Sequence, residues 1–366
     1  MKKKKNFVIC IFLAAVIFIF FNRINRNKTG IPDKTGSWSH INQEVQRSKN
    51  WNQYVQSSQF QLGERRVKGS WNTPNGPEDY YEIEFGTYPS LDGSTVAIPM
   101  AVEFARQHLK FTDEDANDFS SFTTTHYAYE NLILKQPNTL GMIRTSNTFV
   151  EENHPVDLII ATEPSDEEIN LAKDKNVELI IEPVCYDAFV FITHKDNVVD
   201  NLTIEQIQKI YSGEITNWQE VGGKNQSIKA FQREKNSGSQ TAMENLVMKG
   251  IPMLPPNIVK VAAGMGMLVD AVGEYENSQA SIGYTYKYYI DTLYKNENIK
   301  VLKVEGVSPD DENLRNKSYS FTTNYYGVIR KEDEQNIAGK FLEWMISQEG
   351  QKCIEQAGYI PLNMAY

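Results

Sequence analysis

The stretch Arg233–Thr241 reads Arg-Glu-Lys-Asn-Ser-Gly-Ser-Gln-Thr and predicts both local fold and chemistry. Apolar alternation before it indicates a strand, and apolar residues at helical spacing after it indicate a helix, which places Ser237, Gly238 and Ser239 at a helix N-terminus. The first N–H groups of a helix have no intrahelical acceptor, and the helix dipole is positive there, so an anion is favoured. Arg233 can add a permanently charged, planar donor. The alternative is an ordinary N-cap, in which the serines only satisfy backbone groups.

Two further predicted helix starts carry hydroxyl residues at the same place. One opens at Ser94 and Thr95, and the other opens around Thr125. If the fold brought all three starts together, their free N–H groups and hydroxyls would surround an anion with neutral donors. Each start could instead be a plain helix cap, so the convergence is a prediction.

Composition sets the size and class of the protein. The chain has 366 residues, of which 40% are hydrophobic and 11% aromatic, and this allows a globular protein with two domains. The net charge is −10 and no continuous basic run occurs beyond the first five residues, which argues against a nucleic-acid partner. A negative protein can still bind an anion, because surface charge is screened over roughly 8 Å at physiological salt.

The three cysteines, Cys10, Cys185 and Cys353, form no CxxC pair and show no metal-ligand spacing. Free, buried thiols are expected, although Cys185 and Cys353 could pair if the fold brought them together. No metal ion and no cofactor are predicted.

The N-terminus is predicted to be a targeting segment. Lys2–Lys5 precede an apolar run over Phe7–Phe21. At about 1.5 Å per residue the run spans roughly 22 Å, short of a hydrocarbon core of about 30 Å. Residues 1–28 are therefore predicted to be a short membrane anchor or a cleaved signal segment, and the anchor is favoured because no small-residue cleavage site follows. In both cases the rest of the chain is exported.

Residues 29–84 are predicted to be a polar spacer, with a helix over Ile41–Gln59 and a turn-rich stretch at Thr73–Pro77. Beyond the spacer, strand and helix patterns alternate, which predicts an α/β fold with largely parallel sheets and ligands beyond the strand C-termini. The expected strands are Glu82–Phe85, Asp157–Thr162, Glu178–Glu182, Ala188–Thr193, Ile228–Phe231 and Ser281–Thr285, and the expected helices are Val96–Leu109, Tyr127–Lys135, Asp166–Asn176, Ile204–Tyr211, Thr241–Lys249 and Met265–Tyr275.

Four motifs occur in the order found in one family. They are the Ser94-Thr95 opening, Asp157–Pro164 (Asp-Leu-Ile-Ile-Ala-Thr-Glu-Pro), the Leu202–Trp218 run ending in Tyr-Ser-Gly-Glu-Ile-Thr-Asn-Trp, and Arg233-x3-Ser-Gly-Ser. From about Phe85 to the C-terminus the chain resembles the phosphate-binding proteins of phosphate ABC importers.

The resemblance implies a type II periplasmic-binding-protein fold, in which two α/β lobes enclose a ligand cleft. Residues 85–182 and 286–366 would form lobe I, and residues 183–285 would form lobe II. The crossover strands near Pro183–Tyr186 and Gly283–Thr285 would act as hinges.

The resemblance also implies which residues bind phosphate. Lobe I would contribute the Ser94 loop, with Thr95 and the Val96 amide, and Thr125, while lobe II would contribute Arg233, Ser237, Gly238 and Ser239. Glu163 stands where some members carry an aspartate, and a carboxylate there could accept the proton of monohydrogen phosphate, which sulfate lacks. Glu163 is one methylene longer than that aspartate, and it could instead be a solvated glutamate before a helix.

The function implied is extracytoplasmic capture of inorganic phosphate and delivery to ABC permease and ATPase subunits; the chain itself has no GxxxxGK[ST] motif. An alternative is a membrane-tethered receptor or sensor of the same fold that binds another oxyanion or small ligand. An enzyme is disfavoured, because the five histidines are scattered and no HExxH or GxSxG motif occurs. His126 is the only tempting general base.

Overall fold

The computed structural model describes residues 66–73, 76–84, 88–138, 143–145, 148–151, 154–255, 261–262, 264–274 and 278–362. All of them belong to one compact unit, Val55–Tyr366. The predicted N-terminal anchor and the predicted Ile41–Gln59 helix lie outside the described residues. Within the described ranges, no helix has the length and apolar character needed to cross a membrane.

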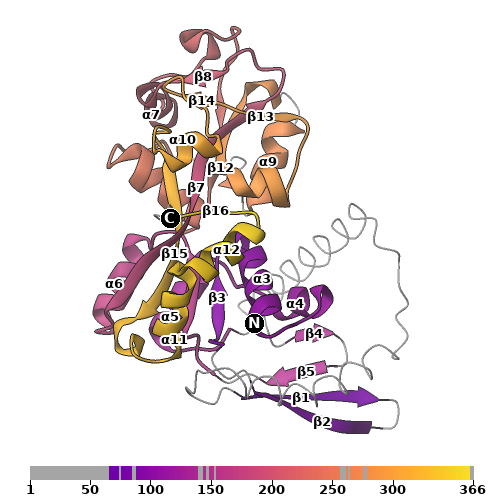
Figure 1. Cartoon of the computed structure of the whole chain (residues 1–366). Coiled ribbons are helices and arrows are strands. Elements are labelled where there is room, and N and C mark those ends of the chain that lie inside the picture. Colours follow the sequence, from indigo (N-terminus) through magenta and orange to yellow (C-terminus); the bar gives the residue numbers. More distant parts are fainter. Residues whose placement is uncertain are drawn as a thin grey trace, which may run out of the picture. The chain divides into compact units, whose positions relative to one another are not determined.

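The long strand β7 (Leu179–His194) organises the described fold (Figure 1). Its first part, up to Ala188, pairs with β15, and its last part, from Phe189, pairs with β12. We call the elements around its first part the β6 half and those around its last part the β12 half. The described eight-stranded sheet runs β3-β6-β15-β7-β12-β9, with β13 and β16 also paired to β7. Its strands are β3 (Leu91–Gly93), β6 (Leu158–Ala161), β9 (Lys229–Ala230), β12 (Ser281–Tyr286), β13 (Ile299–Val301), β15 (Thr322–Arg330) and β16 (Ile360–Pro361).

Two sequence-based expectations about this sheet are wrong. The strands expected at Glu178–Glu182 and Ala188–Thr193 are one continuous strand, and the pairing register shifts beside Pro183, which has no N–H to donate. The sheet is also not largely parallel: in its described part β3–β6 and β9–β12 are parallel, whereas β7 runs antiparallel to β12, β13, β15 and β16. One of its antiparallel strands is β15, a return strand beside β6 and β7 that the alternating pattern did not predict.

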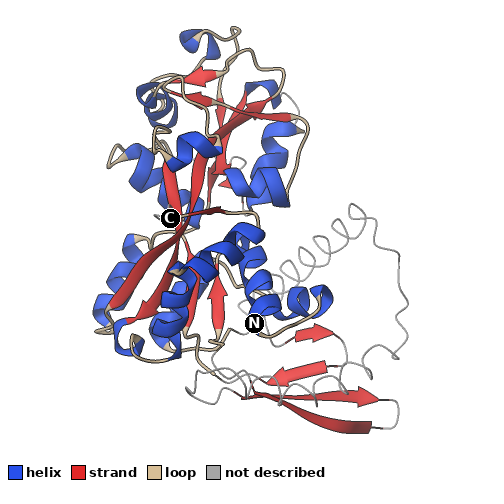
Figure 2. Cartoon of the chain, in the orientation of Figure 1, coloured by secondary structure: helices blue, strands red, loops and turns tan. Residues whose placement is uncertain are grey.

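Helices cover the sheet in both halves (Figure 2). In the β6 half, α5 (Thr125–Leu134) buries Tyr129, Leu132 and Ile133 against β6, and α6 (Asp166–Asp174) packs beside α5. The remaining helices of this half are α3 (Ile98–His108), α4 (Asp113–Phe119), α11 (Ile337–Ile346) and α12 (Gln348–Gln356).

The β12 half contains the Leu202–Trp218 motif, and its residues act there as helix signals. Thr203 caps α7 (Ile204–Ser212) by accepting the Gln206 N–H at 3.1 Å, and Gly213 ends it in the left-handed region at φ 85°. Trp218 is buried and donates from Nε1 to the Ala280 carbonyl at 2.9 Å. The other elements of this half are β8 (Asn201–Leu202), β10 (Gln232–Arg233), α8 (Gly238–Ala242) continued by the π-helix Met243–Met248, β11 (Val261–Ala262), α9 (Met265–Gly273), the π-helix Tyr289–Leu293, β14 (Lys303–Val304) and α10 (Asp311–Arg315).

A separate sheet of order β2-β1-β5-β4 corrects the prediction for the spacer. Two strands lie within the predicted spacer: β1 (Arg66–Thr73) and β2 (Gly76–Glu84) form an antiparallel pair. β1 also pairs with β5 (Thr148–Glu151), which pairs with β4 (Ile143–Thr145). The hairpin is therefore joined by backbone hydrogen bonds to a segment between α5 and β6.

Buried groups of β7 lie where its pairing changes from one half to the other. Cys185 is free and buried, as is Cys353, which confirms the expectation for these two thiols. Asp187 is also buried, and its Oδ1 accepts the N–H groups of Ala188 at 2.7 Å and of Tyr288 at 3.1 Å, which joins β7 to the segment after β12. Its Oδ2 has no hydrogen-bond partner in the described part. Burial raises the pKa of Asp187 to about 7, although hydrogen bonds and Lys287 oppose the rise.

Protonation of Asp187 is expected to make stability depend on pH. Because the pKa of about 7 in the folded state exceeds the ordinary aspartate value of 3.8 expected in the unfolded state, the folded state holds the proton more tightly. Its contribution is complete below pH 4 and is lost as the pH rises through 7, with a total on the order of 4 kcal/mol. Asp187→Asn, which mimics the neutral acid, should flatten this dependence in urea unfolding measured from pH 4 to 8. An unchanged pH profile in the variant would contradict the assignment.

Candidate functional site

Gly238 brings the two halves of the fold into contact. It is the first residue of α8, and a Cβ atom there would lie 2.4 Å from Oγ1 of Thr162 and 2.9 Å from Oγ1 of Thr125. Both threonines belong to the β6 half, at the end of β6 and at the start of α5. Only glycine fits this position without displacing a hydroxyl, so the start of α8 lies directly against two side-chain donors.

Thr162 was not among the residues predicted from the sequence. Its Oγ1 is buried and has no hydrogen-bond partner in the described part of the chain. The nearby Tyr286 hydroxyl donates to the Gly238 carbonyl at 3.1 Å, and Thr162 partly opposes the rise that burial causes in the Tyr286 pKa. The Tyr129 hydroxyl donates to the Thr162 carbonyl at 2.9 Å. A buried hydroxyl without a partner costs free energy, which makes Thr162 a candidate ligand-binding group. Its place at the C-terminal end of the predicted Asp157–Thr162 strand is the signal in the sequence that points to it.

The loop that carries Thr125 is fixed by Asp92. Its buried carboxylate accepts the N–H and the hydroxyl of Thr123, each at 2.7 Å, and the side-chain amide of Asn131 at 2.9 Å. Burial raises the pKa of Asp92, and these hydrogen bonds, together with one from Gly93, oppose the rise. Asp92 therefore ties the end of β3 to the start of α5.

The Ser94 loop lies at the same edge of the sheet as Thr162. The Ser94 N–H donates to the Ile160 carbonyl at 2.9 Å, and β3 and β6 are parallel, so the residues after both strands share one edge. The predicted helix start is confirmed, although it begins with a 3-10 turn, Thr95–Ala97, before α3. Thr95 is exposed, whereas Val96 is buried and its carbonyl accepts the Tyr359 hydroxyl at 2.6 Å.

The predicted residues Ser237, Gly238 and Ser239 do form the start of α8. Ser237 is its N-cap, and its Oγ accepts the Gln240 N–H at 3.3 Å, so this hydroxyl performs the ordinary capping role. Ser239 is buried and accepts from Arg233 Nη1 at 3.4 Å. The helix expected over Thr241–Lys249 is present, but after α8 it continues as the π-helix Met243–Met248 and not as an α-helix.

Arg233 lies beside this helix start. Its Nε donates to the Ala262 carbonyl at 3.0 Å. Burial lowers the pKa of Arg233, and Tyr284 and Glu234 oppose that effect, but the group stays charged. In the described part of the chain no carboxylate forms an ion pair with Arg233. Its charge is therefore available to a bound anion.

Glu163, the predicted acceptor carboxylate, is exposed beside Thr162. Its Oε1 accepts the Tyr326 hydroxyl at 3.0 Å. The structure thus places Glu163 next to the candidate site but joins it to β15 rather than to any predicted donor.

His126 has a structural partner. Its Nδ1 lies 2.7 Å from Oε1 of the buried Glu168, whose Oε2 accepts the Ser165 N–H at 2.6 Å. Burial raises the pKa of Glu168, and both contacts oppose the rise. Among the described side chains, no group of three or more His, Cys, Asp or Glu residues could hold a metal ion.

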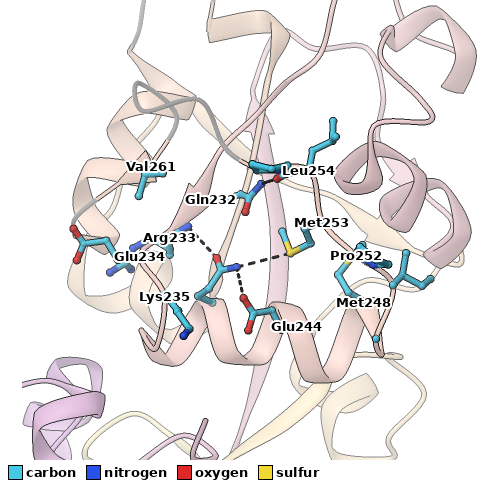
Figure 3. Close-up of a pocket in the computed structure, with 14 residues that line it drawn as sticks. Gln232, Arg233, Glu234, Lys235, Glu244, Met248, Pro252, Met253, Leu254 and Val261 are labelled. Atoms are coloured by element: carbon cyan, nitrogen blue, oxygen red, sulfur yellow. Dashed lines mark hydrogen bonds between the residues drawn. The ribbon is translucent and has the colours of Figure 1, made fainter. Parts of the chain in front are cut away.

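A pocket of about 560 Å³ lies on the side of α8 shown in Figure 3. Arg233 lines it, but Thr125, Thr162 and Gly238 do not. Gln240 also lines the pocket; its side-chain amide donates to Glu244 Oε1 at 2.8 Å, and its Oε1 accepts the Arg233 backbone N–H at 3.2 Å. The Gln240 side chain therefore holds the Arg233 backbone in place. The pocket is distinct from the contact between Gly238 and the two threonines.

Hydroxyl groups of the β6 half thus lie against the start of α8 in the β12 half, and the Arg233 guanidinium lies beside the same helix start. The chain belongs to the PBP superfamily: the PBP superfamily domain matches residues 146–349.

Known relatives of the chain are phosphate-binding proteins. The phosphate-binding protein PstS of Borreliella burgdorferi is 28% identical over 179 residues, covering 48% of this chain and 63% of the relative. That of Bacillus subtilis is 27% identical over 175 residues, covering 46% of this chain and 52% of the relative. The chain thus spans less than two thirds of the length of the curated relatives it matches.

Solved structures agree with the fold. A phosphate ABC transporter substrate-binding protein with bound phosphate, from Clostridium perfringens, aligns with a TM-score of 0.54 and 25% identity, covering 75% of this chain and 99% of that one. An ABC-type phosphate transport receptor from Vibrio cholerae aligns with a TM-score of 0.50 and 20% identity and supports the fold alone. These are binding proteins, and the chain accordingly falls in a non-enzymatic family.

A methyl group at position 238 is expected to destabilise the protein by about 1–3 kcal/mol, because it would overpack the contact with Thr162 and Thr125. Urea unfolding of Gly238→Ala measures this loss. Gly264→Ala is the matched control, since a Cβ there meets no atom within 4 Å. Adding Thr162→Ala to Gly238→Ala should recover part of the loss. Equal stability of the two glycine variants would contradict the close contact.

Proposed function

We propose that this chain binds inorganic phosphate outside the cytoplasmic membrane and delivers it to an ABC importer. The observation that carries the proposal is the buried Thr162 hydroxyl, which has no hydrogen-bond partner among the described residues and faces Gly238 at the start of α8. The uncompensated charge of Arg233 nearby and the names of the relatives support the same ligand.

The proposed site combines neutral donors from both halves with one cation. The β6 half would supply the Ser94 loop, Thr125 and Thr162, with Thr95 and the Val96 amide as the donors of that loop. The β12 half would supply Arg233 and the start of α8 at Ser237, Gly238 and Ser239. N–H and hydroxyl dipoles suit a phosphate dianion in a dry site, because they stabilise its charge without adding a full set of counter-ions.

The proposed architecture is a type II periplasmic-binding-protein fold. The β6 half would form lobe I and the β12 half lobe II, with phosphate in a cleft between them. Because β13 pairs with the last part of β7 and β14 pairs with β8, lobe II would extend beyond residue 285. The division of β7 between two sets of partner strands supports this assignment. Residues 1–28 would hold the chain at the outer face of the membrane, and permease and ATPase subunits would be its partners.

The Glu163 carboxylate is proposed to accept a hydrogen bond from the protonated oxygen of monohydrogen phosphate. Its position beside Thr162 and the hydrogen bond from Tyr326 support this role, since Tyr326 would hold the carboxylate at the edge of the site. Sulfate has no proton to donate and would meet an unpaired negative charge.

Titration calorimetry of the full chain in mild detergent, with phosphate, sulfate and arsenate at fixed salt, tests the proposed function. Tight phosphate and arsenate binding with weak sulfate binding is expected. An absence of phosphate binding would overturn the proposal and would favour a receptor for another ligand.

Arg233→Ala is expected to weaken phosphate binding by about ten- to a hundredfold, because a hydrogen bond to a charged group contributes about 1.5–3 kcal/mol. Arg233→Lys, which keeps the charge but loses the planar fork, should show a smaller loss in the same titration. If phosphate affinity is unchanged in Arg233→Ala, the anion does not contact this side chain.

Glu163→Gln is expected to narrow the ratio of phosphate to sulfate affinity by about tenfold, since one lost charge-assisted hydrogen bond is on the order of 1.4 kcal/mol. Competition titrations at constant ionic strength give the ratio. Glu182→Gln, an exposed carboxylate on β7, serves as the control. Equal ratios in the wild type and Glu163→Gln would place the proton-reading group elsewhere.

A further inference from the structure

Glu167 joins the two halves beside the candidate site. It lies in the first turn of α6 in the β6 half. Its Oε1 accepts the Lys235 ammonium group and its Oε2 accepts the Asn236 side-chain amide, and both donors belong to the β12 half. Each carboxylate oxygen thus has its own partner from the opposite half.

The two donors lie in the middle of the loop that presents the anion-binding groups. Arg233 precedes them at the end of β10, and Ser237 follows them as the N-cap of α8. Asn236 holds the left-handed conformation at φ 63°, and the Ser237 N–H donates to the Glu234 carbonyl at 3.2 Å, which makes the loop a tight turn. Fixing Lys235 and Asn236 therefore fixes both Arg233 and the start of α8 relative to Thr125 and Thr162.

This contact is electrostatic and accessible to solvent. Glu167 and Lys235 are exposed and Asn236 is half-buried. The hydrogen bonds from Lys235 and Asn236 lower the pKa of Glu167, and the same contact raises the pKa of Lys235. Exposed ion pairs are weak and are screened by salt, so this contact can form and break without unfolding either half.

We propose that Glu167 is a positioning residue that holds the Arg233–Ser237 loop onto α6 and so retains the bound anion. The inference rests on the proposed function for its ligand, but it assigns to Glu167, Lys235 and Asn236 a role without ligand contact. These three residues determine the lifetime of the contact between the halves, whereas Arg233 and the hydroxyl groups determine which ligand binds.

Two measurements on the full chain in detergent test this inference. The first is the distance between spin labels at Asp174→Cys in α6 and Lys224→Cys in the β12 half, both exposed, in a Cys10→Ser background without phosphate. Glu167→Gln should shift the distribution toward longer distances. The second is the rate of release of radiolabelled phosphate, which Glu167→Gln should raise about two- to fivefold, the range expected for an exposed ion pair.

Matched variants separate positioning from a general effect of charge. Asp166→Asn removes one negative charge from the same first turn of α6, so it changes the helix dipole interaction equally and should leave both readouts unchanged. The exchange Glu167→Lys with Lys235→Glu should restore slow release, because it rebuilds the ion pair in reverse. High salt should reduce the difference between wild type and Glu167→Gln.

The inference is overturned if Glu167→Gln leaves both the label distances and the release rate unchanged, or if Asp166→Asn reproduces its effects. Failure of the wild type to bind phosphate would overturn the proposed function instead, and the label distances would still decide the role of Glu167.

Discussion

The close contact between Gly238 and two threonine hydroxyls is the constraint on which the rest of the site depends. A Cβ atom at this position would lie 2.4 Å from Thr162 Oγ1, so the start of α8 can approach the β6 half only as bare backbone. The contact places the positive end of a helix against two neutral donors, and within the described part of the chain the buried Thr162 hydroxyl has no hydrogen-bond partner. We propose that a small anion completes this arrangement.

The acidic side chains around this contact explain how a chain of net charge −10 can hold an anion site. The Asp92 carboxylate accepts hydrogen bonds from the loop before α5. Glu168 accepts the Ser165 N–H and contacts His126 Nδ1. Glu167 accepts hydrogen bonds from Lys235 and Asn236. Each carboxylate is occupied by donors that position a neighbouring element. These carboxylates therefore orient neighbouring donors through hydrogen bonds. No described carboxylate forms an ion pair with the Arg233 guanidinium.

Local signals in the sequence were sufficient for the helix starts at Ser94, Thr125 and Ser237. Of the three N-cap residues, Ser237 makes a side-chain capping hydrogen bond, whereas Ser94 and Thr124 do not. Long-range features were not predictable in the same way. β7 was interpreted as two strands because Pro183 interrupts the pattern, and the return strand β15 gave no alternating signal. Thr162 was missed because its role arises from contact with Gly238, a residue far away in the chain, and no local pattern encodes that contact.

The most direct test of the central claim is a crystal structure of the chain grown with arsenate, located by its anomalous scattering. The account predicts one arsenate within hydrogen-bond distance of Thr125 Oγ1, Thr162 Oγ1 and the first amides of α8, with the Arg233 guanidinium on another of its oxygens. Arsenate bound in the pocket beside Gln240, or no ordered arsenate near Thr162, would contradict it.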